Sequence, residues 1–245
     1  MKILVANPNS SKAVTEVVER SAKRQIKNPN TEIITICNYR GTHSIDSTFA
    51  DYQSSWSLIR QIIKRTGEEK IDAVVLAGFG NVGIFALKEA LDIPVLSISE
   101  TSQAIACLMG HKYTILTTMK QSIPLTEDLV RLYRFEGKCA SVRAIGINVQ
   151  RCVTHKEETL NELKDAILKI VEEDGAEVVI LGSGGLCGYD IELQELVKLP
   201  VLDPVTVTTK VAEMMVETGL CHSKKRKFAK PSQEFSAYFW DGEKE

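Results

Sequence analysis

The sequence predicts an α/β protein with two pseudo-symmetric lobes, each a short parallel sheet flanked by helices, and a ligand cleft between them. Short apolar, β-branched runs alternate with segments of helical period, which is typical of parallel sheets covered on both faces. In addition, Asp72–Gly78 matches Glu177–Ser183 at a separation of about 105 residues. A second pair, Ile93–Ser97 and Leu199–Asp203, has almost the same separation, which indicates two copies of one unit of about a hundred residues.

The candidate strands are short runs of apolar residues that end in polar or glycine-rich segments. They are Ile3–Val5, Ile33–Ile36, Ala73–Leu76, Val95–Ile98, Tyr113–Leu116, Ala144–Ile147, Val178–Leu181 and Val201–Leu202. The segments Ile98–Met109 and Pro204–Met215 match each other as helices rich in Ala, Val and Met. We expect residues 1-97 and 206-225 to form the first lobe and residues 98-205 to form the second.

The end of the chain departs from the repeat. Residues 226-245 are expected to form a C-terminal tail that packs by its aromatic side chains, which are Phe235, Tyr238, Phe239 and Trp240. The basic run Lys224–Lys227 is typical of a nuclear import signal or a phosphate-binding patch. Short charge runs more often solvate the end of a helix, and we favour that interpretation.

The bulk composition argues against several classes of partner. With 30 basic and 32 acidic side chains, the 245-residue chain has a net charge of −2, too little to attract nucleic acid or an anionic membrane. No apolar run approaches the roughly 18 residues that span a bilayer, and Met1 leads directly into a strand instead of a signal peptide. We therefore expect a cytoplasmic protein with no nucleic-acid or membrane partner, and a homo-oligomer is compatible with the sequence.

The six cysteines form neither a CxxC pair nor a cysteine–histidine cluster with metal-binding spacing. Most of them lie inside apolar stretches. We interpret them as reduced thiols, and we expect no disulfide framework and no metal site.

A polar loop follows the first strand of the first repeat. The segment Asn7–Ser11 lies between that strand and the helical run Ala13–Gln25, and either Ser10 or Ser11 is a natural N-cap. Free N–H groups at the start of a helix favour an anion such as a carboxylate. Asn9 and Ser10 are therefore candidate ligand-binding residues.

The second repeat offers matching features. Thr117 and Thr118 take the place of the asparagine-serine loop, and we expect both helix starts to face one cleft. Two glycine-rich loops, Gly78–Gly83 and Gly182–Gly188, form a second symmetric pair, in which backbone N–H groups approach a ligand closely. Such loops gather at the carboxyl ends of parallel strands, where α/β sheets bind ligands. The candidate binding residues in them are Gly78, Phe79, Gly80, Asn81, Gly184 and Gly185.

The loop Gly78–Gly83 also has the spacing GxGxxG of dinucleotide sites. A dinucleotide site requires an acidic residue at the end of a second strand, about 20 residues further on, and the predicted strand Val95–Ile98 does not end in one. We therefore reject an NAD site.

Four blocks of the sequence resemble the aspartate/glutamate/hydantoin racemase superfamily, and its hydantoin and allantoin racemase branch in particular. They occur in order between Met1 and about Gly219, and they are Ile3–Ser11, Gly41–Asp46, Ala77–Gly83 with Ala86–Glu89, and Leu181–Gly185. The resemblance implies two pseudo-symmetric lobes, no cofactor, and a small acidic metabolite, such as a carboxylate, hydantoin or ureide, bound between the lobes.

The resemblance also implies two catalytic thiols, one from each lobe, on opposite faces of the stereocentre of the substrate. One thiolate removes a proton and the opposite thiol returns one. At the two positions concerned this chain has Gly78 and Ser183. Glycine has no side chain, and a serine hydroxyl is far too weak an acid to ionise near neutral pH, so two-thiol racemisation is not expected.

Other residues are candidates for the missing groups. Ser183 itself and Cys187, four residues further along the same loop, are candidate catalytic residues. His43 and Ser44 lie in the loop after the second strand, which is expected to border the cleft. We take His43 as a third candidate catalytic residue and Ser44 as a candidate binding residue.

Two functions therefore remain open at this point. The first is a cofactor-independent isomerase or lyase with a non-standard catalytic set. The alternative is a catalytically inactive metabolite-binding or regulatory protein that kept the cleft and lost the thiols. The glycine-rich, polar loops favour the enzyme narrowly.

Overall fold

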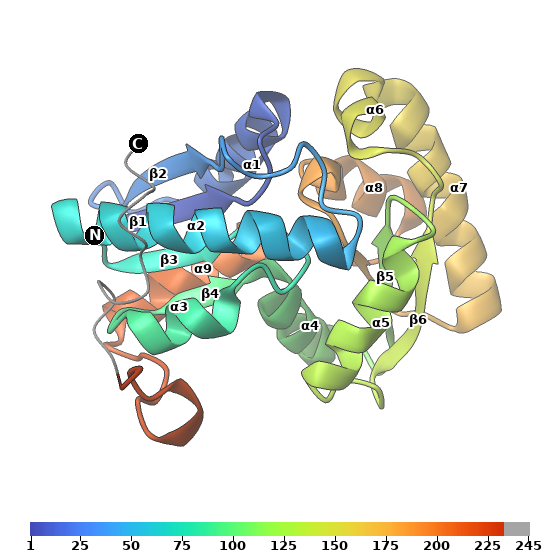
Figure 1. Cartoon of the computed structure of the whole chain (residues 1–245). Coiled ribbons are helices and arrows are strands. Elements are labelled where there is room, and N and C mark those ends of the chain that lie inside the picture. The colour runs from blue at the N-terminus through green and yellow to red at the C-terminus, as the bar shows by residue number, and fades with distance from the viewer. Residues whose placement is uncertain (233–245) are drawn as a thin grey trace.

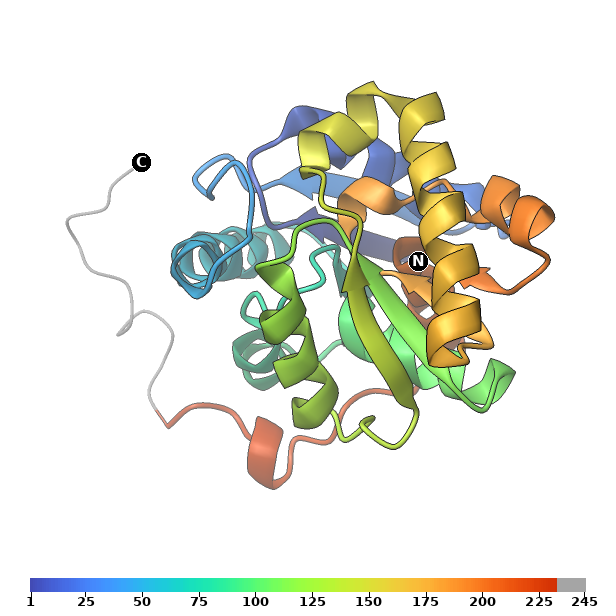
Figure 2. The same cartoon turned by 90° about the vertical axis from the view of Figure 1, so that its right-hand side faces the viewer.

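The structure is a computed structural model that describes residues 1–232, so the four aromatic residues of the predicted tail lie outside the described residues. It contains two four-stranded parallel sheets (Figure 1, Figure 2). The strand order is β2-β1-β3-β4 in the first sheet and β6-β5-β7-β8 in the second, so the two sheets have the same topology. This confirms the predicted α/β fold with two pseudo-symmetric lobes.

The first lobe alternates strands and helices along the chain. Its elements are β1 (Lys2–Asn7), α1 (Lys12–Arg24), β2 (Glu32–Cys37), α2 (Thr48–Glu68), β3 (Ala73–Leu76), α3 (Ile84–Ala90) and β4 (Val95–Ser97). Every residue of the central strand β3 is buried, because apolar clusters cover both faces of this sheet.

The second half of the chain builds the other sheet with the same strand order. From Ile98 onward the elements are α4 (Ile98–Met109), β5 (Tyr113–Thr117), α5 (Ser122–Leu132), β6 (Cys139–Ala144), α6 (Val149–Thr154), α7 (Lys156–Asp174), β7 (Val178–Leu181), the 3-10 helix η1 (Gly184–Leu186), α8 (Asp190–Val197), β8 (Val201–Leu202), α9 (Pro204–Glu217) and the 3-10 helix η2 (Arg226–Phe228). Within residues 1–232, no helix combines the length and the apolar character that a membrane crossing requires.

Two helices join the lobes. α4 and α9 pack against each other between the two sheets (Figure 1). α9 follows β8 of the second sheet but packs on β1, β3 and β4 of the first, whereas α4 follows β4 but packs on β7. One apolar core therefore contains buried residues from both lobes and both helices, including Val75, Ile98, Ile180 and Val205. This shared core holds the lobes together and fixes the position of the loops between them.

The sequence prediction was wrong at one strand. We expected Ala144–Ile147, whereas β6 ends where that run begins. β6 is an edge strand in which only Val142 is buried, so it lacks the continuous apolar run by which we recognised the other strands. Ile145 and Ile147 instead pack against the core of the second lobe from the loop that follows β6.

The basic run Lys224–Lys227 lies against α3. The Lys224 ammonium donates a hydrogen bond to the backbone carbonyl of Lys88 (2.6 Å), near the C-terminal end of α3, where the helix dipole favours a cation. Beside it, the Phe228 ring stacks on the Phe85 ring with a centroid distance of 6.1 Å. Part of this run therefore packs on the first lobe.

Candidate functional site

A cavity of about 180 Å³ lies between the two lobes. Because parallel strands of one sheet end at the same edge, the loops that follow β1, β3, β5 and β7 meet there. The start of α2 and the side of α5 complete the wall. The candidate residues that line it are Asn9, Ser44, Gly78, Phe79, Gly80, Asn81, Thr117, Thr118, Ser183, Gly184 and Gly185. Ser10, His43 and Cys187 are not among the lining residues.

The loop between β1 and α1 is shaped by its own asparagines. The Asn9 side-chain oxygen accepts hydrogen bonds from the Asn7 amide (3.0 Å) and from the Ser11 backbone N–H (2.9 Å). Ser11, one of the two N-caps that the sequence allowed, caps α1, and its hydroxyl accepts a bond from the Val14 N–H. Asn9 thus uses its oxygen within the loop, and among the described residues its side-chain N–H₂ donates to no partner.

The corresponding loop of the second lobe differs from our expectation. Thr117 ends β5 and Thr118 follows it, and both are buried, but α5 begins only at Ser122 and has no side-chain N-cap bond. The prediction that the two threonines start a helix was therefore wrong, because a turn intervenes. Their backbone carbonyls accept bonds from Ile145 (3.1 Å) and Gly146 (2.8 Å), which ties this loop to the end of β6.

In the loop after β3, close packing requires glycine at position 78 and leaves little room for a side chain at Gly80. A Cβ at Gly78 would lie 2.5 Å from Cγ of Pro8, and a Cβ at Gly80 would lie 3.3 Å from Oδ2 of Asp51. Gly83 has a φ of 79°, a left-handed conformation that favours glycine, and it is the N-cap of α3. Much of this wall of the cavity is therefore backbone.

The loop after β7 brings Ser183 to the cavity. The Ser183 hydroxyl accepts a hydrogen bond from the Gly185 N–H (3.3 Å) and caps η1. A Cβ at Gly184 would lie 3.0 Å from the Ala77 carbonyl oxygen of the first lobe, and one at Gly185 would lie 2.5 Å from Cγ1 of Val149. The two glycine loops therefore meet across the boundary between the lobes.

The charges at the cavity are all negative. Three carboxylates line it, those of Asp46, Asp51 and Asp128, and we had not singled out any of them as site residues from the sequence. None of the lining residues, all of which belong to the described part of the chain, is a lysine, an arginine or a histidine. A ligand anion there would meet backbone N–H groups and amide or hydroxyl groups but no cationic side chain.

One polar atom at the cavity lacks a partner. The Asn81 side-chain oxygen is buried, and within residues 1–232 nothing donates a hydrogen bond to it. An unpaired buried acceptor costs about 1–3 kcal/mol. Contact between this oxygen and a ligand in the cavity requires a movement of the Asn81 side chain.

The Asp/Glu/hydantoin racemase family model matches residues 3–212 of the chain. The chain belongs to this family. It is 32% identical to a hydantoin racemase of Paenarthrobacter aurescens, over 96% of this chain and 99% of that protein. The structure of an allantoin racemase from Pseudomonas fluorescens has a TM-score of 0.90 and 33% identity over 96% of this chain and 98% of the other. An allantoin racemase from Klebsiella pneumoniae has the same TM-score, 29% identity, and coverage of 96% and 95%.

Within this racemase fold, Cys187 lies away from the cavity. η1 carries the chain from Ser183 to the far side of the loop, where the Cys187 side chain is 4% exposed. Burial, and then the neighbouring Asp203 carboxylate, raise the pKa of the thiol well above its ordinary value. A thiol in this position stays protonated near neutral pH, which does not suit a proton acceptor.

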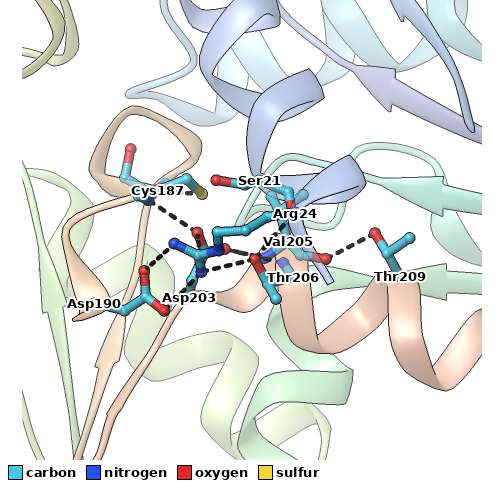
Figure 3. A network of polar contacts seen from close by, with 10 residues as sticks. Ser21, Arg24, Cys187, Asp190, Asp203, Val205, Thr206 and Thr209 are labelled. Atoms are coloured by element: carbon cyan, nitrogen blue, oxygen red, sulfur yellow. Dashed lines mark hydrogen bonds and ion pairs between the residues drawn. The ribbon is translucent and has the colours of Figure 1, made fainter. Parts of the chain in front are cut away.

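An ion network holds the end of the Ser183 loop (Figure 3). Arg24 of α1 donates to both oxygens of Asp190 at 2.8 and 2.7 Å and lies 3.6 Å from Asp203. Asp203 caps α9 and also accepts a bond from the Gly188 N–H (2.9 Å). The network therefore ties the first lobe, α9 and the segment beyond η1 to one another.

The burial of Cys187 predicts low reactivity. We expect iodoacetamide to alkylate the exposed Cys221 readily. In the folded protein Cys187 should react at least about 100-fold more slowly than Cys221, because its reaction requires local opening of the structure. Mass spectrometry of tryptic peptides measures both rates in one sample, and the urea-unfolded protein provides the matched control. Comparable rates for the two cysteines in the folded protein would show that the thiol is accessible.

His43 lies at the outer edge of the cavity. It is exposed on the loop after β2, and its Nε2 is 2.7 Å from the side-chain nitrogen of Gln150 on α6. Its chain neighbour Ser44 lines the cavity, as does Val149 beside Gln150, so this contact joins the two lobes at the rim. The structure therefore places His43 outside the lining, against the opposite lobe.

Metal binding has no support in the residues that the structure describes. Among them, no group of three or more His, Cys, Asp or Glu side chains is arranged to hold a metal ion.

Proposed function

We propose that this protein is a cofactor-independent isomerase that binds a hydantoin ring or a related ureide between its lobes and exchanges the proton at the stereocentre of the ligand. The observation that carries the proposal is the charge of the cavity lining. Three carboxylates line the cavity, and none of the described residues that line it is cationic. A dicarboxylate such as aspartate or glutamate would be repelled there. A neutral ring with carbonyl and N–H groups would not.

The polar groups of the cavity support this choice of ligand. The Asn9 side-chain N–H₂, which donates to no described residue, suits a ring carbonyl. The glycine loops offer backbone N–H groups to an oxygen that gains negative charge when the proton is removed. The names of the similar proteins, hydantoin racemase and allantoin racemase, support the same class of substrate.

The test is hydrogen–deuterium exchange. The protein is incubated in D₂O near neutral pD with 5-substituted hydantoins, with allantoin, and separately with aspartate and glutamate, and the signal of the stereocentre proton is followed by NMR. We expect that signal to disappear about 100-fold or more faster than in protein-free samples for at least one hydantoin or ureide, as general-base catalysis predicts, and not for the dicarboxylates. Exchange with the dicarboxylates alone, or with none of these compounds, would contradict the proposal.

The alternative function, a metabolite-binding protein without catalysis, is favoured by one observation. The two positions at which the resemblance implies thiols are Gly78 and Ser183, and Pro8 fills the space beside Gly78. In that case hydantoins or ureides should raise the melting temperature by mass action while their stereocentre proton does not exchange. Thermal shift and NMR on the same samples distinguish the two functions.

A further inference from the structure

We propose that Asp51 is the proton acceptor on the first-lobe side of the cavity. The inference rests on the proposed function, because it assigns the base for that reaction. The Asp51 carboxylate supplies an acid–base group from the lobe in which Gly78 has no side chain. The carboxylate is not the group that the family resemblance implies, and it follows from the packing of α2 against the glycine loop.

The position of Asp51 is the first argument. It lies in the first turn of α2, a helix of 21 residues whose N-cap, Ser47, accepts a bond from the Ala50 N–H. Asp51 lines the cavity together with Ser47 and is half-buried. A side chain on a capped, 21-residue helix is held more firmly than one on a loop, as a catalytic group requires.

The contact with the glycine loop is the second argument. Oδ2 of Asp51 lies 3.3 Å from the point at which a Cβ on Gly80 would be placed. Gly80 is two residues beyond Gly78, on the same wall of the cavity. Because neither glycine has a side chain, the Asp51 carboxylate lies directly beside the backbone of this wall. The first lobe therefore presents an acid–base group where it presents no thiol.

The hydrogen bonding of the carboxylate is the third argument. The Ser55 hydroxyl donates to Oδ1 at 2.7 Å and fixes the orientation of the group. Within residues 1–232, no donor or cation pairs with Oδ2. One oxygen is thus anchored and the other is free to accept a proton from a ligand, which is the arrangement expected of a general base.

The two other carboxylates at the cavity fit this role less well. The Asp128 side chain is 73% exposed and pairs with Arg131 at 2.8 Å, so its charge is directed to solvent and to its own helix. Asp46 lies on the loop between β2 and α2, outside any helix or strand, and it is not among the atoms nearest to a Cβ placed on Gly78 or Gly80. Both residues line the cavity, so the matched comparison position is Glu68, which is exposed at the C-terminal end of α2 and does not line the cavity.

The proposed reaction needs only the Asp51 carboxylate, the Ser183 hydroxyl and water. Oδ2 of Asp51 takes the proton from the stereocentre, the C–H electron pair moves into the adjacent ring carbonyl, and an enolate forms while Asp51 becomes a carboxylic acid. Water then supplies a proton to the opposite face through the Ser183 hydroxyl, which gives one proton to carbon and receives one from water. Asp51 returns its proton to the hydroxide that remains, and no oxidant, reductant or metal takes part.

The experiment compares Asp51→Asn with Glu68→Gln in the D₂O assay, with ligand-induced thermal shift measured on each variant. We expect Asp51→Asn to lower the exchange rate about 100-fold or more while the thermal shift persists, because the amide keeps its size but accepts no proton. Glu68→Gln should stay within about threefold of the unaltered protein, since this carboxylate lies on the same helix but outside the cavity lining.

Two further results test whether Asp51 is the base. Asp51→Glu should recover part of the exchange rate, because it restores a carboxylate at a displaced position, whereas a purely structural role would make it worse than asparagine. If the unaltered protein exchanges the proton and Asp51→Asn does so equally fast, Asp51 is not the base but the proposed function stands. If the unaltered protein exchanges none, the proposed function itself fails, and this inference fails with it.

Discussion

Replacing Ser183 by cysteine is expected to raise the rate of stereocentre-proton exchange by about 100-fold or more. The Ser183 side chain already lines the cavity and is oriented by its bond to the Gly185 N–H. A thiol of ordinary pKa is a few per cent ionised at pH 7, whereas a hydroxyl is ionised far less. A positioned acid–base group accelerates a reaction about 100- to 10,000-fold. The thiol supplies such a group on the second-lobe face of the ligand, opposite Asp51.

The D₂O exchange assay checks this prediction, with Ser183→Ala as the matched control. Alanine removes the hydroxyl that passes the proton to carbon and adds no ionisable group, so it should lower the rate. The new thiol can also be removed again by alkylation, which should cancel the gain in Ser183→Cys and have no effect on the alanine variant. An exchange rate in Ser183→Cys equal to that of the unaltered protein would show that position 183 does not face the stereocentre.

The first-lobe position is a less suitable place to restore a thiol. A Cβ at Gly78 would lie 2.5 Å from the ring of Pro8, whose movement is limited by the loop between β1 and α1. Overpacking of this kind costs about 1–3 kcal/mol. Gly78→Cys should therefore lower the free energy of unfolding in urea, while Ser183→Cys, which adds little volume, should not.

The fold was predictable because its cues are local. β3 and β7 are continuous apolar runs, and both are buried at every residue. The repeated spacing of these runs gave the two-lobed arrangement, since each copy forms one sheet with the same strand order. β6 was misplaced because an edge strand needs only one apolar face, and the apolar residues that follow it pack from a loop.

The site was predictable only where it depends on topology. Loops after β1, β3, β5 and β7 must meet at the carboxyl ends of the strands, and their residues do line one cavity. Asp51 was missed because in the sequence it is an ordinary acidic residue in the first turn of a helix, and only the packing of α2 brings it to Gly80. Cys187 illustrates the opposite case, because one turn of 3-10 helix separates it from the cavity despite its proximity to Ser183 in the chain.

Replacing Arg24 by methionine is expected to lower the free energy of unfolding by about 3–5 kcal/mol. Its guanidinium compensates two carboxylates, of which the Asp190 side chain is 10% exposed and that of Asp203 is 1% exposed. Methionine keeps much of the packing volume but leaves both negative charges without their cation. Arg20→Met, an exposed change one turn earlier on α1, is the matched control and should cost no more than about 0.5 kcal/mol.

The loss should also depend on pH in a defined direction. Burial, and next the nearby Asp203 charge, raise the pKa of Asp190, while Arg24 lowers it, so removing Arg24 raises it further. A carboxyl whose pKa is raised in the folded state binds its proton more tightly there than in the unfolded chain, so stability is lost as pH rises through that range. The loss of stability in Arg24→Met should therefore shrink as the pH falls from neutral, and Arg24→Met with Asp190→Asn should recover part of it at pH 7.

Urea unfolding at several pH values measures both effects. A deficit no larger than that of Arg20→Met, or one that grows as the pH falls, would show that the network does not hold the two lobes through charge.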